Sequence, residues 1–254
     1  MYDTDQSETA LHNQKEENND FNGEVYVRLG FIRKVYGILS VMLTISCIFI
    51  SFSLIPSVHD KLDQNKEGND SIPNILIVLL IISFIGTFAT LIPLFCFRSI
   101  ARRVPLNYIL LFLFTIFESY CLFLVSACYE PQIVISAMVL TAAIAIGLTC
   151  YAMTTKSDFT MWGGCLFAAL FLFVAFGILL AIFGIRTKFL YMVICLVGLF
   201  IYSIYLVYDT QLTMGKGAYK YQIDEYVWAA VNLYIDIIEI FIYILRILGS
   251  SNRN

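Results

Sequence analysis

The sequence predicts an all-α polytopic membrane protein with seven transmembrane helices. Hydrophobic residues make up 59% of its 254 residues and charged residues only 14%, whereas a soluble domain averages about 45–50% apolar and about 25% charged residues. Seven runs of about 20 mostly apolar residues follow one another along the chain, and this length crosses a ~30 Å hydrocarbon core as an α-helix. The few ionisable side chains inside these runs recur at helical spacing, which indicates a bundle with a polar interior.

The chain begins with a polar segment that cannot form a packed core. Residues 1–24, MYDTDQSETALHNQKEENNDFNGE, are acidic and nearly free of branched apolar residues, a composition typical of disorder. We therefore expect residues 1–30 to be a disordered, acidic cytosolic tail and residues 31–254 to form the transmembrane domain. We expect no signal peptide, because the first apolar run starts after residue 30, has no cleavage site and is long enough to span.

The seven expected spans are joined mainly by short polar connections. Their approximate ranges are 35–55, 74–96, 106–128, 132–153, 162–184, 189–211 and 226–248. Only the polar segment from Pro56 to Pro73 makes a longer connection. Short connections make consecutive helices antiparallel neighbours, so we expect one compact bundle in the lipid bilayer.

The positions of lysine and arginine predict which helix ends face the cytosol. With a cytosolic N-terminus, the inner side collects Arg28, Arg33, Lys34, Arg98, Arg102, Arg103, Lys156, Lys216 and Lys220. The outer side then collects Lys61, Lys66, Arg186, Lys188, Arg246 and Arg253. This bias favours a cytosolic N-terminus. The side of the C-terminus stays open, because a charged last helix could be re-entrant and return to the side from which it started.

The last span contains the stretch NLYIDIIEIFIYIL (Asn232 to Leu245), which carries two acids near its middle. A buried, ionised carboxylate without a partner is strongly unfavourable in an apolar medium. At 100° per residue, the polar side chains of this span share one face. The members of that face are Glu225, Ala229, Asn232, Asp236, Glu239, Tyr243 and Arg246. We therefore expect this face to lie against protein or water rather than lipid.

The sixth span carries a similar polar face that ends at Asp209, and the third span carries Glu118. Because the sixth and seventh spans are antiparallel and joined by a short loop, Asp209 and Asp236 could face one cavity. Two carboxylates in a dry site cannot both ionise cheaply. They could share a proton, bind a hard cation through their oxygens, or be neutralised by Arg102 or Arg103. Each outcome predicts a site that responds to pH and to cations.

A purely structural role for these acids is the alternative. Each acid would then be satisfied by Asn232, by a tyrosine or by Arg246, and would only fix the register of the helices. Several acids on converging faces favour a functional role over this alternative. Glu239 is the least distinctive of them, since it could extend toward the membrane surface or pair with Arg246.

Four segments resemble the Bax-inhibitor (TMBIM) family, with the closest likeness to its Lifeguard and Golgi anti-apoptotic branches. They are GFIRKVYGILSVMLTIS (Gly30 to Ser46), RRVPLNYILLFLFTIFESY (Arg102 to Tyr120), VYDTQLTMG (Val207 to Gly215) and DEYVWAAVNLYIDIIEIFIYILRILG (Asp224 to Gly249). Their order and spacing cover nearly the whole membrane domain. The resemblance implies a Bax-inhibitor-like fold, in which six helices surround a central seventh.

The resemblance also implies a function and the residues that carry it. It implies a pH-sensitive calcium leak channel that lowers stored calcium and suppresses apoptosis. The paired aspartates of the family match Asp209 and Asp236, which would form the ion site and gate and hold calcium; no further cofactor is implied. The arginine that latches this pair in bacterial relatives matches Arg102 or Arg103, and the acid of the third helix matches Glu118.

The resemblance places the protein in an endomembrane, that of the Golgi or the endoplasmic reticulum, with the plasma membrane as the alternative. Partners besides the bilayer, calcium and protons would be death-pathway or calcium-store membrane proteins. One residue departs from the family pattern: this chain has DIIE where the family usually has DIIN, so Glu239 replaces an amide. The extra carboxylate could strengthen cation binding, or it could hold the site shut through Arg246.

Other classes of protein fit the sequence less well. A retinal protein needs a lysine inside its last span, and the last lysine here is Lys220. A G-protein-coupled receptor has an external N-terminus and usually a disulfide-forming external cysteine, whereas all seven cysteines here lie in apolar runs. Paired aspartates can activate water, but no substrate motif accompanies them, so we expect no enzyme. No basic cluster indicates nucleic-acid binding.

The main rival to the channel is a non-conducting membrane scaffold that inhibits cell death by binding partner proteins. The acidic tail would serve as its docking segment, and the buried acids would only fix helix register. The two hypotheses differ in one respect. Partner binding would survive neutralisation of Asp209 and Asp236, whereas a leak that they govern would not.

Overall fold

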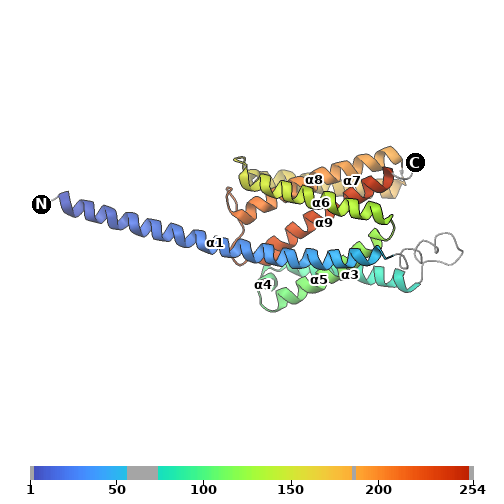
Figure 1. The fold of residues 1–254 in the computed structure, drawn as a ribbon, viewed down its shortest axis with the longest axis horizontal. Helices are drawn as coiled ribbons and strands as arrows, with labels where there is room; N and C mark the ends of the chain where they lie inside the picture. Colours follow the sequence, from blue (N-terminus) through green and yellow to red (C-terminus); the bar gives the residue numbers. More distant parts are fainter. Residues whose placement is uncertain (1–2, 56–73, 185–186, 252–254) are drawn as a thin grey trace.

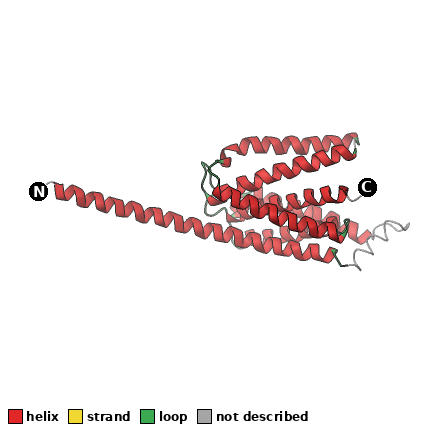
Figure 2. Ribbon diagram, turned by 45° about the horizontal axis from the view of Figure 1, so that its top comes forward, coloured by secondary structure: helices red, strands yellow, loops and turns green. Residues whose placement is uncertain are grey.

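The protein is a bundle of long helices that lie side by side along one axis (Figures 1 and 2). Its computed structural model describes residues 3–55, 74–184 and 187–251, with no side-chain detail for residues 3–22, 74–77, 98 and 251. The helices are α1 (Asp3–Ser53), α3 (Asn74–Cys96), α4 (Arg98–Ala101), α5 (Leu106–Ser126), α6 (Pro131–Thr154), the short 3-10 helix η1 (Phe159–Trp162), α7 (Gly163–Phe183), α8 (Lys188–Met214) and α9 (Tyr226–Ser251). The long polar connection expected from Pro56 to Pro73 lies outside the described residues.

Within the described part of the chain, six helical stretches are long and apolar enough to cross a membrane. They are Gly23–Ser53, Val78–Cys96, Leu106–Ser126, Pro131–Thr154, Phe159–Phe183 and Lys188–Met214. These stretches confirm the expected all-helical, multi-pass membrane protein. The seventh expected span coincides with α9, which is not among the six. α9 is instead an enclosed helix, because none of its residues from Tyr226 to Ser250 is exposed.

Helix α9 is the element around which the others pack. It contacts α1, α5, α6 and α8, and in Figure 1 it passes between α6 and α1. Ala229 and Ala230 let neighbouring helices approach closely, while the large side chains of Leu233 and Tyr234 are fully buried. Close approach at small residues is how helices associate inside a membrane, where lipid is as apolar as the side chains. By contrast, Leu166 is the only buried residue of α7.

Helix α8, which carries Asp209, begins and ends at capping residues, and α7 before it ends at one. Gly184 ends α7 with φ 65° and Gly215 ends α8 with φ 70°, a left-handed conformation that glycine adopts without a Cβ penalty. The hydroxyl of Thr187 accepts a hydrogen bond from the backbone N–H of Leu190 (3.3 Å) and caps the start of α8. These caps fix the ends of α8 and thereby place Asp209 near its C-terminal end.

The N-terminal segment differs from the sequence prediction. We expected residues 1–30 to be disordered, whereas α1 extends without interruption from Asp3 and projects beyond the bundle (Figure 1). The segment contains no proline to interrupt a helix, so a helix that is nucleated beside it can extend through it. The membrane span of α1 supplies that nucleus. Among the residues whose side chains are described, Glu24 of α1 pairs with Lys220 at 3.2 Å.

Gly198 on α8 provides a test of the packing against α9. A Cβ at this position would clash with the ring of Tyr243, which is buried and stacked on Tyr202 at 5.9 Å. We expect Gly198→Ala to lower the free energy of unfolding by about 1–3 kcal/mol, the usual effect of overpacking. Thermal unfolding of the purified protein in detergent measures this change.

Gly177→Ala on α7 is the matched control, because a Cβ there meets open space. Since alanine has the higher helix propensity, this control should leave stability unchanged or raise it by up to about 1 kcal/mol. A Gly198→Ala protein that unfolds at or above the wild-type temperature would contradict the close contact between α8 and Tyr243.

Candidate ion site in the helix bundle

The structure brings Asp209 of α8 and Asp236 of α9 together. Both are buried, with 5% and 4% of their surface exposed, and their carboxyl groups lie within hydrogen-bonding reach of each other. Both line a cavity of about 630 Å³ between α3, α7, α8 and α9. The sequence predicted that these two residues could face one cavity, and their positions agree with that prediction. What they do there stays a prediction.

A tyrosine from the α8–α9 connection completes the pair. The hydroxyl of Tyr221 donates a hydrogen bond to Oδ1 of Asp209 (2.7 Å) and accepts one from Nδ2 of Asn232 (2.8 Å). Burial, and next the adjacent Asp209, raise the pKa of Tyr221 well above its usual value, so its hydroxyl stays protonated and donates at neutral pH. Asn232, expected to support the site, therefore acts through Tyr221.

Asp236 has less support than Asp209. Its Oδ2 is buried and receives no hydrogen bond from a donor among the described residues. Nor does any ion pair within the described part of the chain reach either aspartate. Two adjacent carboxylates without a positive partner cannot both be ionised cheaply. The geometry therefore suits a shared proton, or a bound cation whose charge replaces that proton.

The described residues include no group of three or more His, Cys, Asp or Glu side chains arranged to hold a metal ion. A cation at this site would therefore take two carboxylates from the protein and complete its shell with neutral oxygens. Calcium accepts such mixed sets of carboxylate, hydroxyl, carbonyl and water oxygens. The hydroxyls of Tyr202, Tyr205 and Tyr208 belong to side chains that line the same cavity.

The arginines expected to latch the aspartates lie elsewhere. Arg102 pairs through Nε with Asp224 (2.9 Å) and through Nη2 with Glu225 (3.1 Å), and it also donates to Gln222 (3.0 Å). Arg103 is exposed. At the rim of the bundle both partners of Arg102 keep some water, so pairing there avoids the desolvation that a latch at Asp209 would require. In this structure Arg102 thus ties the α4–α5 connection to the start of α9.

A second pair of acids, Glu118 and Glu239, lines a separate cavity of about 290 Å³ between α3, α5 and α9. The hydroxyl of Thr87 makes a long contact of 3.4 Å with Oε2 of Glu118. The two acidic cavities share Phe88, Leu91 and Ile235 in their walls. The acids therefore form two neighbouring pairs, with apolar side chains between them, rather than one cluster.

Arg246 lies beyond the second pair, toward the C-terminal end of α9. Its guanidinium lies 5.7 Å from the centre of the Tyr243 ring and lines a separate pocket beside Tyr129 and Lys188. Among the described ion pairs, none joins Arg246 to Glu239, although its charge acts on that carboxyl at longer range. The direct pairing that the sequence allowed is therefore absent from this structure.

The loop that carries Tyr221 is held by two residues far away in the sequence. Arg28 of α1 donates to the backbone carbonyls of Leu212 and Tyr221. Asp158, before η1, accepts from the backbone N–H of Ala218 (2.8 Å) and from the hydroxyl of Thr160 (2.6 Å). Sequence reasoning missed Tyr221 and Asp158 as parts of the site, because no helical periodicity includes a loop residue.

Comparison with known proteins places the chain among its relatives. Residues 28–253 match the family described as "Inhibitor of apoptosis-promoting Bax1". The chain is 32% identical to human "Protein lifeguard 3", over 89% of this chain and 70% of that protein. It is also 32% identical to mouse "Protein lifeguard 4" and to the "Golgi anti-apoptotic protein" of vaccinia virus (strain Lister), in each case over 92% of this chain and 94% of the relative.

Replacing Tyr221 by phenylalanine tests the support of the aspartate pair. Tyr221→Phe removes the donor to Asp209 and the acceptor of Asn232 while it keeps the ring. Because buried polar groups are left unpaired, we expect a loss of about 1–3 kcal/mol in the free energy of unfolding. Tyr219→Phe is the control in the same loop, since Tyr219 is 62% exposed and should change stability by less than about 0.5 kcal/mol. Equal thermal unfolding of the two variants would contradict the buried network.

The hydrogen bonds that Asp158 accepts from Thr160 and Ala218 give a test of pH dependence. The hydroxyl of Thr160, and next the N–H of Ala218, lower the pKa of Asp158. A carboxylate with a lowered pKa stabilises the fold fully above its unfolded pKa of about 3.9 and loses this effect as pH falls through the lower folded value. We therefore expect the stability difference between the wild type and Asp158→Asn to be constant from about pH 8 to about pH 5 and to shrink in stronger acid. Thermal unfolding across pH measures it; a difference that changes between about pH 8 and pH 6 would contradict this assignment.

Proposed function

The chain belongs to the Bax-inhibitor family, and from this premise we propose that it is a pH-sensitive calcium leak channel of intracellular membranes with Asp209 and Asp236 as its ion site and gate. The family match and the Lifeguard and Golgi anti-apoptotic relatives make it a non-enzymatic, anti-apoptotic, multi-pass membrane protein. The proposal adds the ion, the gate and the route by which cell death is suppressed, namely a lower store of calcium.

The single observation that carries the proposal is the pair of facing, buried carboxyl groups without a positive partner among the described residues. Ionisable groups inside a membrane protein are rare and mark ion or proton paths by default. With a shared proton the pair carries one negative charge instead of two, so it attracts a cation less strongly. When that proton leaves, the extra negative charge attracts a hard cation through carboxylate oxygens. Proton and calcium would thus compete for the same two residues.

The second pair of acids supports a path beyond the first. Glu118 and Glu239 line the neighbouring cavity, and Phe88, Leu91 and Ile235 stand between the two cavities. Hydrophobic constrictions of this kind close channels by excluding water. We assign Glu118 and Glu239 a supporting role, as the next oxygen ligands for a cation that passes this constriction.

The membrane arrangement belongs to the same proposal. We take α9 as the seventh crossing, surrounded by the six apolar spans. Its 26 residues measure ~39 Å along a helix axis, enough for a ~30 Å hydrocarbon core. Its contacts with four other helices keep its charged side chains away from lipid. The name of the viral relative, "Golgi anti-apoptotic protein", favours the Golgi or another endomembrane as the location.

Calcium efflux from proteoliposomes tests the proposal. The wild type should release calcium, and faster at about pH 8 than at about pH 6, because protons compete with calcium for the aspartates. Asp209→Asn and Asp236→Asn should each abolish this pH response, because either change removes the acid pair. Thermal unfolding confirms that each protein is folded before flux is measured.

Glu24→Gln is the control for loss of one carboxylate, since Glu24 lies on the surface and pairs only with Lys220 among the described ion pairs. It should keep both the leak and its pH response. No flux above that of empty liposomes from the folded wild type would reject the channel. The scaffold would then be the better hypothesis, with the projecting N-terminal part of α1 (Figure 1) as its docking segment.

A further inference from the structure

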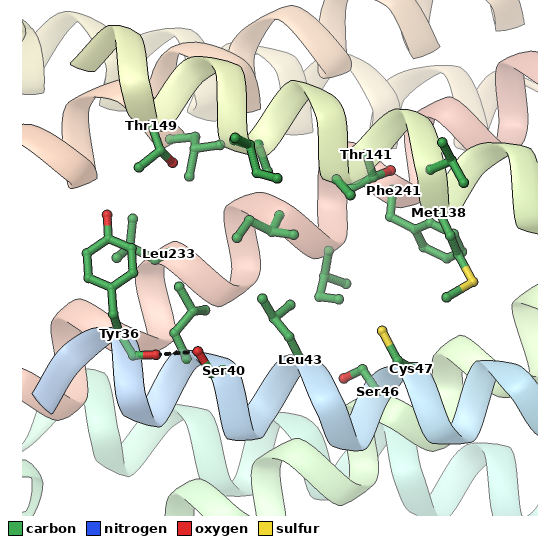
Figure 3. A pocket seen from close by; sticks show the side chains of 18 of the residues that line it. Tyr36, Ser40, Leu43, Ser46, Cys47, Met138, Thr141, Thr149, Leu233 and Phe241 are labelled. Carbon is green, nitrogen blue, oxygen red and sulfur yellow. Dashed lines mark hydrogen bonds between the residues drawn. The ribbon is translucent and has the colours of Figure 1, made fainter. Parts of the chain in front are cut away.

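A groove of about 620 Å³ opens between α1 and α6, with α9 as its floor (Figure 3). It shares no lining residue with the cavity of Asp209 and Asp236, so its occupant is a separate question from ion conduction. Cavities of this size that are mainly apolar and carry a few polar groups at defined places are typical binding sites for small molecules. Because its walls belong to membrane-spanning helices, its occupant comes from the bilayer.

Both walls of the groove mix small and large side chains. On the α6 side, the single methyl groups of Ala142 and Ala145 lie among larger residues such as Ile146. On the α1 side, Leu39 and Leu43 are branched and bulky. The two alanines leave space against α6 for a flat apolar body. Rigid occupants also lose less conformational entropy on binding.

One end of the groove carries a polar group without a hydrogen bond. Tyr36, Ser40 and Thr149 lie toward this end in Figure 3. Ser46 and Thr141 lie toward the other end with Met138 and Phe241, but their hydroxyls are already hydrogen-bonded. The hydroxyl of Tyr36 is buried and makes no hydrogen bond of ordinary geometry among the described residues; its polar neighbour is the hydroxyl of Thr210, which also lacks one. Buried hydroxyl groups in native proteins nearly always form a hydrogen bond, so one that forms none within the protein indicates that a bound molecule completes it. Here a hydroxyl group of a ligand would meet that need.

The depth of this polar end agrees with the position of a lipid hydroxyl. Tyr36 lies at the start of the hydrophobic run of α1, close to the expected membrane boundary. From Tyr36 to Ile50, which also lines the groove, α1 rises by ~21 Å, somewhat more than half of the ~30 Å hydrocarbon core. The groove therefore begins near one interface and extends past the middle of the membrane, so an occupant could place its polar group at the interface and its body in the hydrocarbon.

We propose that this groove binds a membrane sterol, with the sterol hydroxyl at Tyr36 and the ring system between α1 and α6. The head of the occupant is small and neutral, because none of the described residues that line the groove is charged. A phospholipid would bring a phosphate, which favours Lys and Arg partners. The segment from Lys34 to Leu39 also has the basic, aromatic, aliphatic order that is a weak pattern for sterol contact.

Photo-crosslinking tests the sterol site in the full-length protein. The protein is reconstituted in liposomes with a photoreactive sterol that keeps its hydroxyl, and the labelled peptides are mapped with and without excess cholesterol. We expect label on α1 and α6 that cholesterol displaces. Ala142→Leu, which fills the groove, should reduce displaceable label about tenfold. Ala143→Leu, one residue away and outside the groove lining, should leave it unchanged.

Tyr36→Phe tests the polar end without changing the shape of the groove. Loss of one hydrogen bond should weaken displacement by cholesterol about three- to tenfold. The variant should also no longer distinguish cholesterol from its 3-keto analogue. Tyr151→Phe on the exposed face of α6 is the control and should behave as the wild type. This readout keeps the proposal testable if Ala142→Leu fails to fold.

Two results would overturn the proposal. Equal labelling of Ala142→Leu and Ala143→Leu would show that the sterol only contacts the lipid-facing surface of the bundle. Label from a phospholipid with a photoreactive acyl chain, on the same peptides and not displaced by cholesterol, would identify an acyl chain as the occupant. Neither result bears on calcium efflux, so failure here is distinct from failure of the leak hypothesis.

Discussion

The facing carboxyl groups of Asp209 and Asp236 impose the condition that the rest of the bundle meets. Hydrocarbon cannot solvate two acids, so the helix that carries Asp236 has to be covered by protein on every side. Helix α9 meets this condition, since none of its residues from Tyr226 to Ser250 is exposed. The same condition explains why a loop residue, Tyr221, reaches in to donate to Asp209. Burial of α9 and the position of the α8–α9 loop thus have one cause.

Three charged residues from separate elements hold that loop or its end. Arg28 of α1 binds the backbone carbonyl of Tyr221 in the loop and that of Leu212 at the end of α8. Asp158 before η1 binds the N–H of Ala218, and Arg102 after α4 binds Asp224 and Glu225. All three contacts lie at the end of the bundle where Asp209 is found. A shift of any of these elements would therefore move the loop that carries Tyr221 and change the support of the acid pair.

Helical periodicity predicted much of the fold and the core of the site. The positions of Asp209 and Asp236 on polar faces of consecutive helices were enough to predict that they could share a cavity. Periodicity could not predict Tyr221 or Arg28, because the contact between them joins residues 193 positions apart. Nor could periodicity show that Arg102 would bind Asp224 and Glu225 at the rim of the bundle rather than the aspartate pair. Composition predicted a disordered tail over residues 1–30, but composition alone does not include the helix nucleus that the following span supplies to this segment.

Helix α9 has two faces with different neighbours. Asn232, Asp236 and Glu239 line or support the acidic cavities, while Leu233, Ile237 and Phe241, spaced four residues apart, form the floor of the groove between α1 and α6. A molecule in that groove would press on the back of the helix that carries the acids. Because packed helices shift as rigid units rather than deform, any coupling between the groove and the acid pair would have to pass through a shift of α9.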